Sequence, residues 1–502
     1  MGARRTPNKG RWVEPGRILM GKSRRPVAAL TLAALMLASC GGDGGTLGSG
    51  PVTVTPTPSP TPTPNCALAS RQSFAKAVID EWYLFPGDVA SGVNPGAYSD
   101  VQSYIDALVA PARALNKDRF FTYITSIAEE NAFFESGSSA GFGVLMAYDA
   151  VNQRIVIAEA YEGAPAFAAG IDRGTAIVGI GTNSGNVRTL ASIVAAGGTQ
   201  GLTDALGPND PGVSRVLRIT DAAGTRDVTV AKADYALDPV SDRYGAKIIS
   251  EGGRNYGYLN LRTFISSADN QLGAAFADFR AQGVTDIVID FRYNGGGLVS
   301  TANLMGDLMG AGRAGQLFSQ TRFRPSKSAE DDEHRFAPGA QSIAPTRIAF
   351  IGTGSTASAS ELVINSMLPY LGTNMTLVGS NTFGKPVGQI ALDKAECDDR
   401  MRVVAFATGN ASGQSDYYDG LAPKIANSCA ANDDLGFPLG DPREASIRAA
   451  IDFLAGNACT TRIADANART ASSDRRFAVA APPTMLVPDR PSAAQRELPG
   501  LF

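Results

Sequence analysis

The segment from Arg347 to Glu361, RIAFIGTGSTASASE, decides the fold class of this chain. Its first five residues form an apolar run typical of a buried strand. A glycine turn follows, and a helix is predicted from about Ala359 to Leu368. The same pattern recurs on both sides, with strands at 257–261, 285–291 and 376–379 and helices at 270–281 and 299–309. This alternation predicts an α/β layer.

A serine stands where that predicted helix begins. Ser358 lies between two alanines, and small neighbours allow a ligand to approach the backbone closely. The amides at a helix N-terminus lack partners within the helix, and the positive end of its dipole favours negative charge. Taken alone, however, the pattern is explained equally well by Ser358 or Ser360 serving as an N-cap.

The chain contains one histidine, His334, which excludes a site with several histidine ligands. His334 lies in the polar run 330–335, which is typical of a solvated loop. Lys385 is a better candidate base, because it follows the next predicted strand and so returns to the same edge of the sheet as Ser358. A lysine acts as a base only when it is neutral, which requires burial to lower its pKa. Gln389 is placed to orient the amine.

Three motifs in this order resemble those of the C-terminal processing (tail-specific) proteases of the S41 serine peptidase family. They are Asp-x-Arg-x-Asn-x-Gly-Gly at 290–297, Thr-Ala-Ser-Ala-Ser-Glu at 356–361 and Phe-Gly-Lys-x-x-x-Gln at 383–389. The resemblance covers roughly residues 119–424. It implies an α/β multidomain protein with a ClpP/crotonase-like protease core. Two departures are the proline that follows the lysine, where glycine is common, and a slightly long spacing between serine and lysine.

The resemblance also implies roles for individual residues. Ser358 is the nucleophile, Lys385 the general base, and Gln389 its support. The oxyanion hole is formed by the amide of Ala359 and by that of Gly296 or Gly297. No metal and no cofactor are implied.

A second resemblance, to PDZ domains, covers the stretch before the core. Gly141-Phe142-Gly143-Val144 resembles the loop that receives a peptide's terminal carboxylate, and 163–170 resembles a common PDZ segment. Short strands are predicted at 154–158, 175–181 and 226–231. PDZ domains bind peptides by adding them to a sheet as an extra strand. Gly174-Thr175 departs from the usual Gly-Asp, and a small β domain without a ligand stays an alternative.

The ends of the chain have a different composition. Residues 1–40 resemble a lipoprotein signal peptide that ends in Leu-Ala-Ser-Cys, so Cys40 is the expected lipidation site, with an ordinary signal peptide as the alternative. Residues 41–65 are rich in glycine, proline and threonine, which predicts an extended tether. The expected location is the periplasmic face of a membrane, more specifically the outer membrane.

The remaining boundaries follow from changes in pattern. We expect a helical domain at 66–138, the PDZ-like domain at 139–236, the protease core at 237–458 and a peripheral tail at 459–502. In the first of these, helices are predicted near residues 74–83, at 101–108 and at 119–133.

Four further cysteines suggest disulfides in an exported protein. The pairing favoured here is Cys397 with Cys429 and Cys66 with Cys459, and buried free thiols are the alternative.

These features predict a serine endopeptidase that cleaves exported proteins at or near their free C-termini. The net charge of −3 argues against nucleic acid as a partner. One alternative is a degenerate module that only binds C-termini, and another is a non-peptidase relative that handles small ligands. A Gly-x-Ser-x-Gly match at 137–141 suggests a hydrolase elbow, but no buried strand precedes it.

Overall fold

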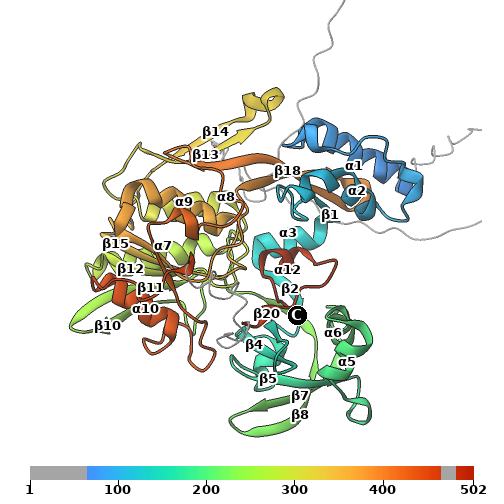
Figure 1. Cartoon of the computed structure of the whole chain (residues 1–502), viewed down its shortest axis with the longest axis horizontal. Coiled ribbons are helices and arrows are strands. Elements are labelled where there is room, and N and C mark those ends of the chain that lie inside the picture. The colour runs from blue at the N-terminus through green and yellow to red at the C-terminus, as the bar shows by residue number, and fades with distance from the viewer. Residues whose placement is uncertain (1–64, 465–481) are drawn as a thin grey trace, which may run out of the picture.

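A computed structural model describes residues 65–464 and 482–502 (Figure 1). The predicted signal peptide, Cys40 and nearly all of the tether lie outside these residues. No helix within the two described ranges is long and apolar enough to cross a membrane.

The core is a six-stranded sheet in the order β10-β11-β12-β15-β16-β19. All neighbours pair in parallel except β10 and β11. Its strands are β10 (Ala246–Glu251), β11 (Arg254–Asn260), β12 (Asp286–Asp290), β15 (Arg347–Gly352), β16 (Met375–Gly379) and β19 (Asn427–Ala430). The predicted mixed α/β fold is therefore confirmed.

Helices cover this sheet on both faces, as its nearly continuous apolar strands require. One apolar cluster packs the sheet against α7 (Ala268–Ala281), α8 (Val299–Leu308) and α9 (Ala359–Leu371). A second cluster packs it against α10 (Ala445–Leu454). Figure 1 shows these two layers on the larger lobe of the molecule.

A second sheet lies beside the core and is organised around β18 (Asp399–Asn410). Its other strands are β1 (Tyr123–Ser126), β13 (Leu317–Phe323), β14 (Asp332–Arg335) and β17 (Val387–Lys394). The N-terminal helices α1 (Leu68–Trp82) and α2 (Val101–Ala114) share one apolar cluster with β17 and β18. The N-terminal helices are thus packed directly on the hairpin that follows Lys385.

The third predicted N-terminal helix, at 119–133, is wrong in its first half. The Asp118 carboxylate accepts the amides of Phe121 and Thr122, which folds the chain into a turn. β1 then pairs with β18, and helix α3 (Ile127–Ser136) begins only after it. Tertiary pairing therefore overrides the local helical pattern.

The smaller lobe is a β domain, and we use this name for residues 138–236. Its sheet has the order β20-β3-β4-β5-β7-β8, in which β20 (Thr484–Met485) comes from the end of the sequence and β6 lies beside β5. A β2–β9 pair joins the domain to the body. The strands are β2 (Ser138–Gly141), β3 (Val144–Asp149), β4 (Arg154–Ala160), β5 (Ala176–Gly181), β6 (Arg188–Thr189), β7 (Ser214–Asp221), β8 (Gly224–Ala231) and β9 (Ala233–Ala236). The helices are α4 (Pro165–Ala168), α5 (Leu190–Gly197) and α6 (Gln200–Leu206). Ser138–Gly141 is a strand, so the Gly-x-Ser-x-Gly match at 137–141 does not form a nucleophile elbow.

The end of the sequence is not peripheral as predicted. Strand β20 (Thr484–Met485) pairs with β3 of the β domain, and α12 (Ala493–Glu497) packs near α3. Leu498 and Leu501 are buried in the junction of the two lobes, and Phe502 is buried in the apolar core of the β domain. Figure 1 shows this segment between the lobes.

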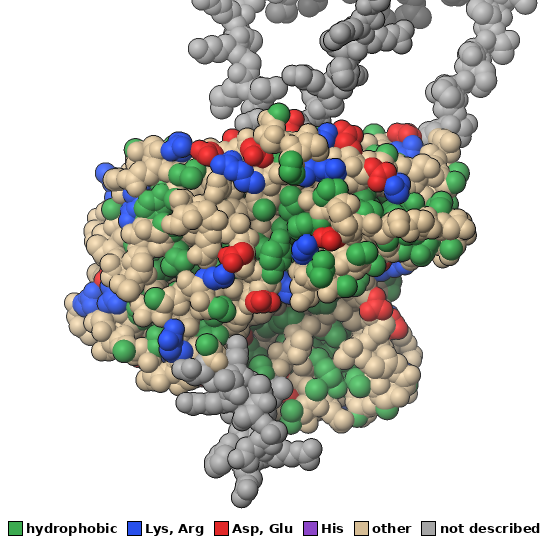
Figure 2. Space-filling view, turned by 45° about the horizontal axis from the view of Figure 1, so that its top comes forward, with side chains coloured by type: hydrophobic (Ala, Val, Ile, Leu, Met, Phe, Trp, Pro, Cys, Tyr) green, Lys and Arg blue, Asp and Glu red, His purple; other side chains and the backbone are tan. Residues whose placement is uncertain are grey.

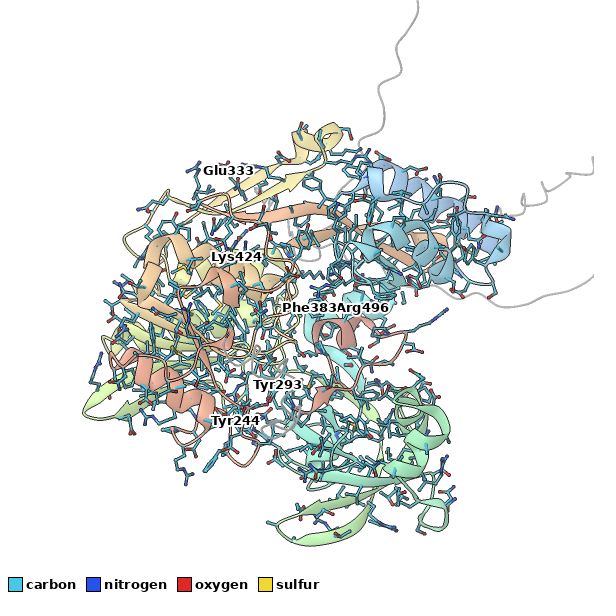
Figure 3. All side chains as sticks on the ribbon, viewed as in Figure 1. Tyr244, Tyr293, Glu333, Phe383, Lys424 and Arg496 are labelled. Atoms are coloured by element: carbon cyan, nitrogen blue, oxygen red, sulfur yellow. A yellow bond between two sulfur atoms is a disulfide. The ribbon has the colours of Figure 1, made fainter. Side chains whose placement is uncertain are left out.

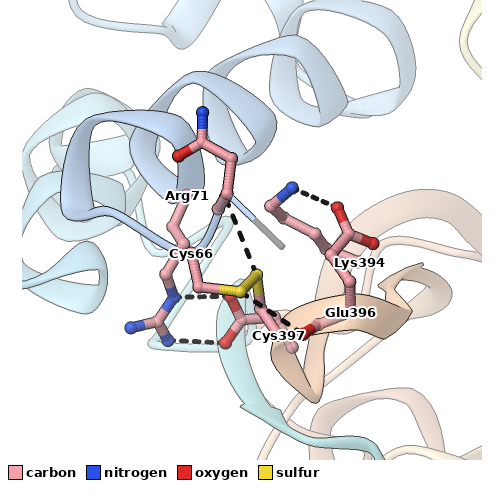
Figure 4. Close-up of a disulfide and its surroundings, with 7 residues drawn as sticks. Cys66, Arg71, Lys394, Glu396 and Cys397 are labelled. Carbon is pink, nitrogen blue, oxygen red and sulfur yellow. Dashed lines mark hydrogen bonds and ion pairs between the residues drawn. A yellow bond between two sulfur atoms is a disulfide. The ribbon is translucent and has the colours of Figure 1, made fainter. Parts of the chain in front are cut away.

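The favoured disulfide pairing is also wrong. Cys66 pairs with Cys397, and Cys429 pairs with Cys459. Cys66 precedes α1, which packs on β18, while Cys397 ends the short 3-10 helix Ala395–Cys397 in the β17–β18 turn. Arg71 of α1 pairs with Asp399 beside this bond (Figure 4). The packing of α1 on the hairpin therefore decides the pairing, with Cα atoms 5.5 Å apart.

Candidate active site

Ser358 lies between the end of β15 and the start of α9, at the C-terminal edge of the parallel strands. Its backbone has φ of +52° and ψ of −114°, a conformation that non-glycine residues adopt only when their surroundings impose it. The side chain is half-buried. The amide of Ala359, the first residue of α9, points out of the helix N-terminus beside it. This places a hydroxyl next to a backbone donor.

Glu361 holds the serine and the lysine together. One of its carboxylate oxygens accepts the amides of Ser358 at 3.1 Å and of Lys385 at 2.7 Å. The other accepts the Thr382 hydroxyl at 2.6 Å and the Gly384 amide at 2.7 Å. Burial raises the pKa of Glu361 to about 7, although these donors favour its charged form. The start of α9 and the lysine-bearing loop are therefore tied to one buried carboxyl.

The side chain of Lys385 is turned towards Phe121, which lies between α2 and β1. Its Nζ donates to Gln389 Oε1 at 2.9 Å and lies 4.8 Å from the centroid of the Phe121 ring. Gln389 donates in turn to the carbonyl of Phe121. Burial lowers the pKa of Lys385, as a base at neutral pH requires. Among the described residues, no hydrogen bond joins Lys385 Nζ to Ser358 Oγ.

Arg119 fixes the lysine loop from the other side. Its guanidinium donates to the carbonyls of Phe383 at 2.7 Å and Gly384 at 2.5 Å, and lies 4.0 Å from the centroid of the Phe383 ring. Gly384 has φ of +89°, and a Cβ there would lie 2.2 Å from the carbonyl oxygen of Tyr418. The loop is thus held by three separate parts of the chain.

The glycine turn after β12 packs against the serine. A Cβ on Gly296 would lie 2.7 Å from Ser358 Cβ and 3.0 Å from the Ala359 amide. The Gly296 amide itself donates to Asn294 Oδ1 at 2.9 Å. The amide of the preceding residue, Gly295, donates to the carbonyl of Glu497 at 2.8 Å. Of the two glycines implied for the oxyanion hole, Gly296 is thus in contact with Ser358, and its neighbour Gly295 binds a carbonyl of the chain's own tail.

Sequence reasoning did not identify Glu361, Arg119 or Gly295 as site residues. Glu361 was detectable, since Ser358 and Glu361 have the Ser-x-x-Glu spacing of a capping box. Arg119 was hidden by the incorrect helix at 119–133. Gly295 acts through its backbone, which leaves no sequence signal beyond the glycine run.

The predicted peptide-binding residues lie on the β domain, before and at the start of β3. The amides of Gly143 and Val144 donate to the carbonyl oxygen of Phe502 at 2.8 and 3.3 Å. Phe142 is fully buried in the β-domain core, and a Cβ on Gly141 would lie 2.8 Å from the carbonyl carbon of Phe502. The loop formed by these four residues therefore contacts the backbone of Phe502, a residue of the same chain.

His334 is on β14, where its Nε2 pairs with Asp307 at 2.9 Å, and it belongs to none of these contacts. No cluster of three or more His, Cys, Asp or Glu residues suited to a metal occurs in the described ranges.

The site opens into a cavity between the two lobes, and Figure 2 shows a hollow there. Lys385, Phe121 and Gly295 line it from the larger lobe, and Arg496 and Glu497 line it from the tail. Phe383 and Arg496, both labelled in Figure 3, line this cavity as well. On the face shown in Figure 2, acidic and basic side chains are interspersed, and neither sign forms a patch.

Comparison with known proteins gives a consistent result. Residues 255–426, which include β11, β12, the glycine turn, α9 and the lysine loop, match the model of peptidase family S41. The chain is 26% identical over 271 residues to a chloroplastic C-terminal processing peptidase of Tetradesmus obliquus, covering 52% of this chain and 54% of the relative. It is 25% identical over 290 residues to a probable CtpA-like serine protease of Staphylococcus epidermidis, covering 57% and 52% respectively.

A solved structure shares the fold. The structure of a putative S41 protease from Bacteroides fragilis aligns with a TM-score of 0.60 and 24% identity, covering 76% of this chain and 97% of that one. The chain spans about half the length of the curated relatives it matches. Residues 255–426 are thus a peptidase domain, and the enzyme class they indicate is a serine-type hydrolase.

Proposed function

We propose that this protein is a serine endopeptidase that cleaves other proteins at or near their C-termini with a Ser358–Lys385 dyad. The observation that carries the proposal is the single Glu361 oxygen that binds the amides of both residues. This shared oxygen holds the backbones of Ser358 and Lys385 together beside a helix N-terminus, which supports their assignment as nucleophile and base. The names of the relatives, C-terminal processing peptidase and CtpA-like serine protease, support the reaction class.

The chemistry follows from these positions. Ser358 Oγ attacks the peptide carbonyl carbon while its proton passes to the neutral amine of Lys385. The negative oxygen that forms is stabilised by the Ala359 amide and by the glycine turn at 295–297. The C–N bond then breaks, and Lys385 returns the proton to the leaving amine. Water hydrolyses the resulting ester, again with Lys385 accepting a proton, and Ser358 is restored.

Gln389 and Phe121 position the amine in this scheme. Gln389 Oε1 accepts a hydrogen bond from Lys385 Nζ, and the apolar ring of Phe121 covers the amine. Loss of solvation disfavours the ammonium form, and so the neutral base is present at lower pH than for an exposed lysine.

Substrate recruitment is assigned to the β domain acting as a PDZ-like module. The β3 edge and the amides of Gly143 and Val144 are suited to a peptide backbone that adds as a strand. The alternative is a degenerate module that only binds C-termini.

One experiment separates these two functions. Wild-type protein and Ser358→Ala are incubated with an unfolded protein that has a free apolar C-terminus, and the products are analysed by mass spectrometry. A peptidase yields shortened products with the wild type only, while both proteins bind the substrate tail. Equal binding with no products from the wild type would favour the binding module.

We further propose that the protein is an exported lipoprotein anchored through Cys40 on the periplasmic face of the outer membrane. The lipobox-like sequence, with Gly41 after the cysteine, supports this location, and the two disulfides fit an oxidising compartment. Mass spectrometry of the membrane fraction should find an acylated Cys40 at the N-terminus. An unmodified N-terminus at another residue would contradict the anchor.

A further inference from the structure

The segment Gly500–Phe502 lies along β3 as an added antiparallel strand. Met146 donates to the Gly500 carbonyl at 2.8 Å, and Phe502 donates to the Val144 carbonyl at 3.0 Å. The Phe502 carbonyl oxygen in turn accepts the Gly143 amide, and Leu145 and Leu501 form an antiparallel bridge. This is the hydrogen-bond pattern by which a peptide extends a sheet.

The side chains of this strand alternate between two apolar surroundings, as a strand requires. Phe502 is 3% exposed and belongs to the core cluster of the β domain, with Phe142, Val144 and residues of α5 and α6. Leu501 is 1% exposed and belongs to the cluster between the lobes, with Leu145 and Phe133. Both faces of the strand are therefore buried.

The residues just before this strand lie at the catalytic entrance. Gly295, next to the glycine that touches Ser358, donates to the carbonyl of Glu497. The guanidinium of Arg496 lies 3.6 Å from the centroid of the Tyr123 ring. Glu497 is 8% exposed, and its negative charge opposes the lowering of the Lys385 pKa by burial. The tail thus contacts both the glycine turn at 295–297 and Tyr123 of β1.

The tail residues at this entrance are helical and do not have the extended conformation of a bound substrate. Glu497 is the last residue of α12, and Gln495 Nε2 donates to the Leu501 carbonyl at 2.7 Å, which closes the segment on itself. A helical turn does not present an extended peptide bond to Ser358. The Gly295 amide is already bonded to the carbonyl of Glu497.

We propose that residues 493–502 are an intramolecular inhibitor: the last three occupy the peptide groove of the β domain, and α12 blocks the entrance to Ser358 and Lys385. A peptide with apolar C-terminal residues competes for the groove and releases the block. The inhibitory part of this inference rests on the proposed peptidase function. The occupied groove rests on the contacts between Gly500–Phe502 and β3.

The test compares wild type with Phe502→Asp, which places a charge in the apolar groove. Phe502→Leu is the conservative control, and Val487→Asp is a control at a side chain that is 45% exposed. Hydrogen exchange of the stretch 141–148 reports groove occupancy. Hydrolysis of a short, C-terminally amidated, internally quenched peptide reports access to Ser358.

We expect fast exchange at 141–148 in Phe502→Asp only, with hydrolysis faster by about tenfold or more, because an open state of a few per cent becomes the main one. The peptide Leu-Pro-Gly-Leu-Phe, added in trans, should accelerate the wild type and leave Phe502→Asp unchanged.

Equal exchange and equal rates in wild type and Phe502→Asp would overturn the inference while leaving the peptidase intact. Release of the tail as a cleavage product would show a substrate and overturn it as well. If no variant hydrolyses the peptide, the proposed peptidase function fails, and the exchange data alone decide whether the tail occupies the groove.

Discussion

Gly296 is the residue whose size most directly limits the site. A methyl group there would lie 2.7 Å from Ser358 Cβ, and its φ of +122° disfavours any other residue. Gly296→Ala should lower kcat by about 100-fold, because the added methyl group would displace Ser358 and the Ala359 amide, and loss of one oxyanion-hole donor acts on that scale. Gly354→Ala is the matched control, because nothing lies within 4 Å of a Cβ in that loop. Equal activity of the two variants in peptide hydrolysis would contradict the packing described.

Glu361 predicts a pH dependence of stability. Burial raises its pKa to about 7 in the folded protein, above its ordinary value of 4.5. The neutral form is thus favoured by folding, and this stability is complete below about pH 4.5 and is lost as the pH rises through about 7. Thermal melting at about pH 5 and pH 8 should show this loss in wild type, on the order of 3 kcal/mol. In Glu361→Gln the loss should be absent.

The same variant tests the role of Glu361 as a positioning residue. In glutamine, one of the two carboxylate oxygens is replaced by an NH₂ group, which donates and cannot accept. The variant therefore loses either the contacts with the Ser358 and Lys385 amides or those with Thr382 and the Gly384 amide. We expect kcat to fall by about 10-fold to 100-fold while KM changes little. A Glu361→Gln enzyme with wild-type kcat would show that the shared carboxyl does not align the dyad.

Among the elements, α1 is joined covalently to the β17–β18 hairpin by the Cys66–Cys397 bond. The two cysteines are 331 residues apart, against 30 for Cys429 and Cys459. In the chain-entropy model a longer closed loop gives more stabilisation, typically about 2–4 kcal/mol for a disulfide. The double variant Cys66→Ser/Cys397→Ser should therefore lower Tm more than Cys429→Ser/Cys459→Ser. The reverse order in calorimetry would contradict this.

Helices and strands with a clear hydrophobic pattern could be predicted from the sequence, and strands that form only by pairing with a distant segment could not. The strand at 285–291 and the helix at 299–309 are present as β12 and α8, because buried parallel strands and amphipathic helices leave strong local patterns. The helix at 119–133 failed because β18 draws Tyr123–Ser126 into a strand. Pairing between residues almost 280 positions apart leaves no local signal.

At the level of the whole molecule, the sequence located the serine and lysine motifs, but it did not show how the parts meet. The closure of the site by Arg119 and Phe121 depends on α1 and α2 packing against β17 and β18. The disulfide pairing follows from the same packing. The tail is predicted to be peripheral, because its alanine- and proline-rich composition masks Leu498, Leu501 and Phe502, which packing against the two lobes buries.

The central claim is that Lys385, and not His334, is the base for Ser358. Its most direct test is the pH dependence of kcat/KM for a quenched peptide, measured in the wild type and in Ser358→Ala, Lys385→Ala, Lys385→Arg and His334→Ala, all in the presence of the Leu-Pro-Gly-Leu-Phe peptide. Since burial lowers the pKa of Lys385 and only the neutral amine accepts a proton, the wild-type rate should rise with pH through that lowered pKa. The first three variants should lose about 100-fold or more, including Lys385→Arg, since a guanidinium stays protonated. His334→Ala should keep the wild-type profile within a few-fold. Activity retained by Lys385→Arg and lost by His334→Ala would contradict the Ser–Lys dyad.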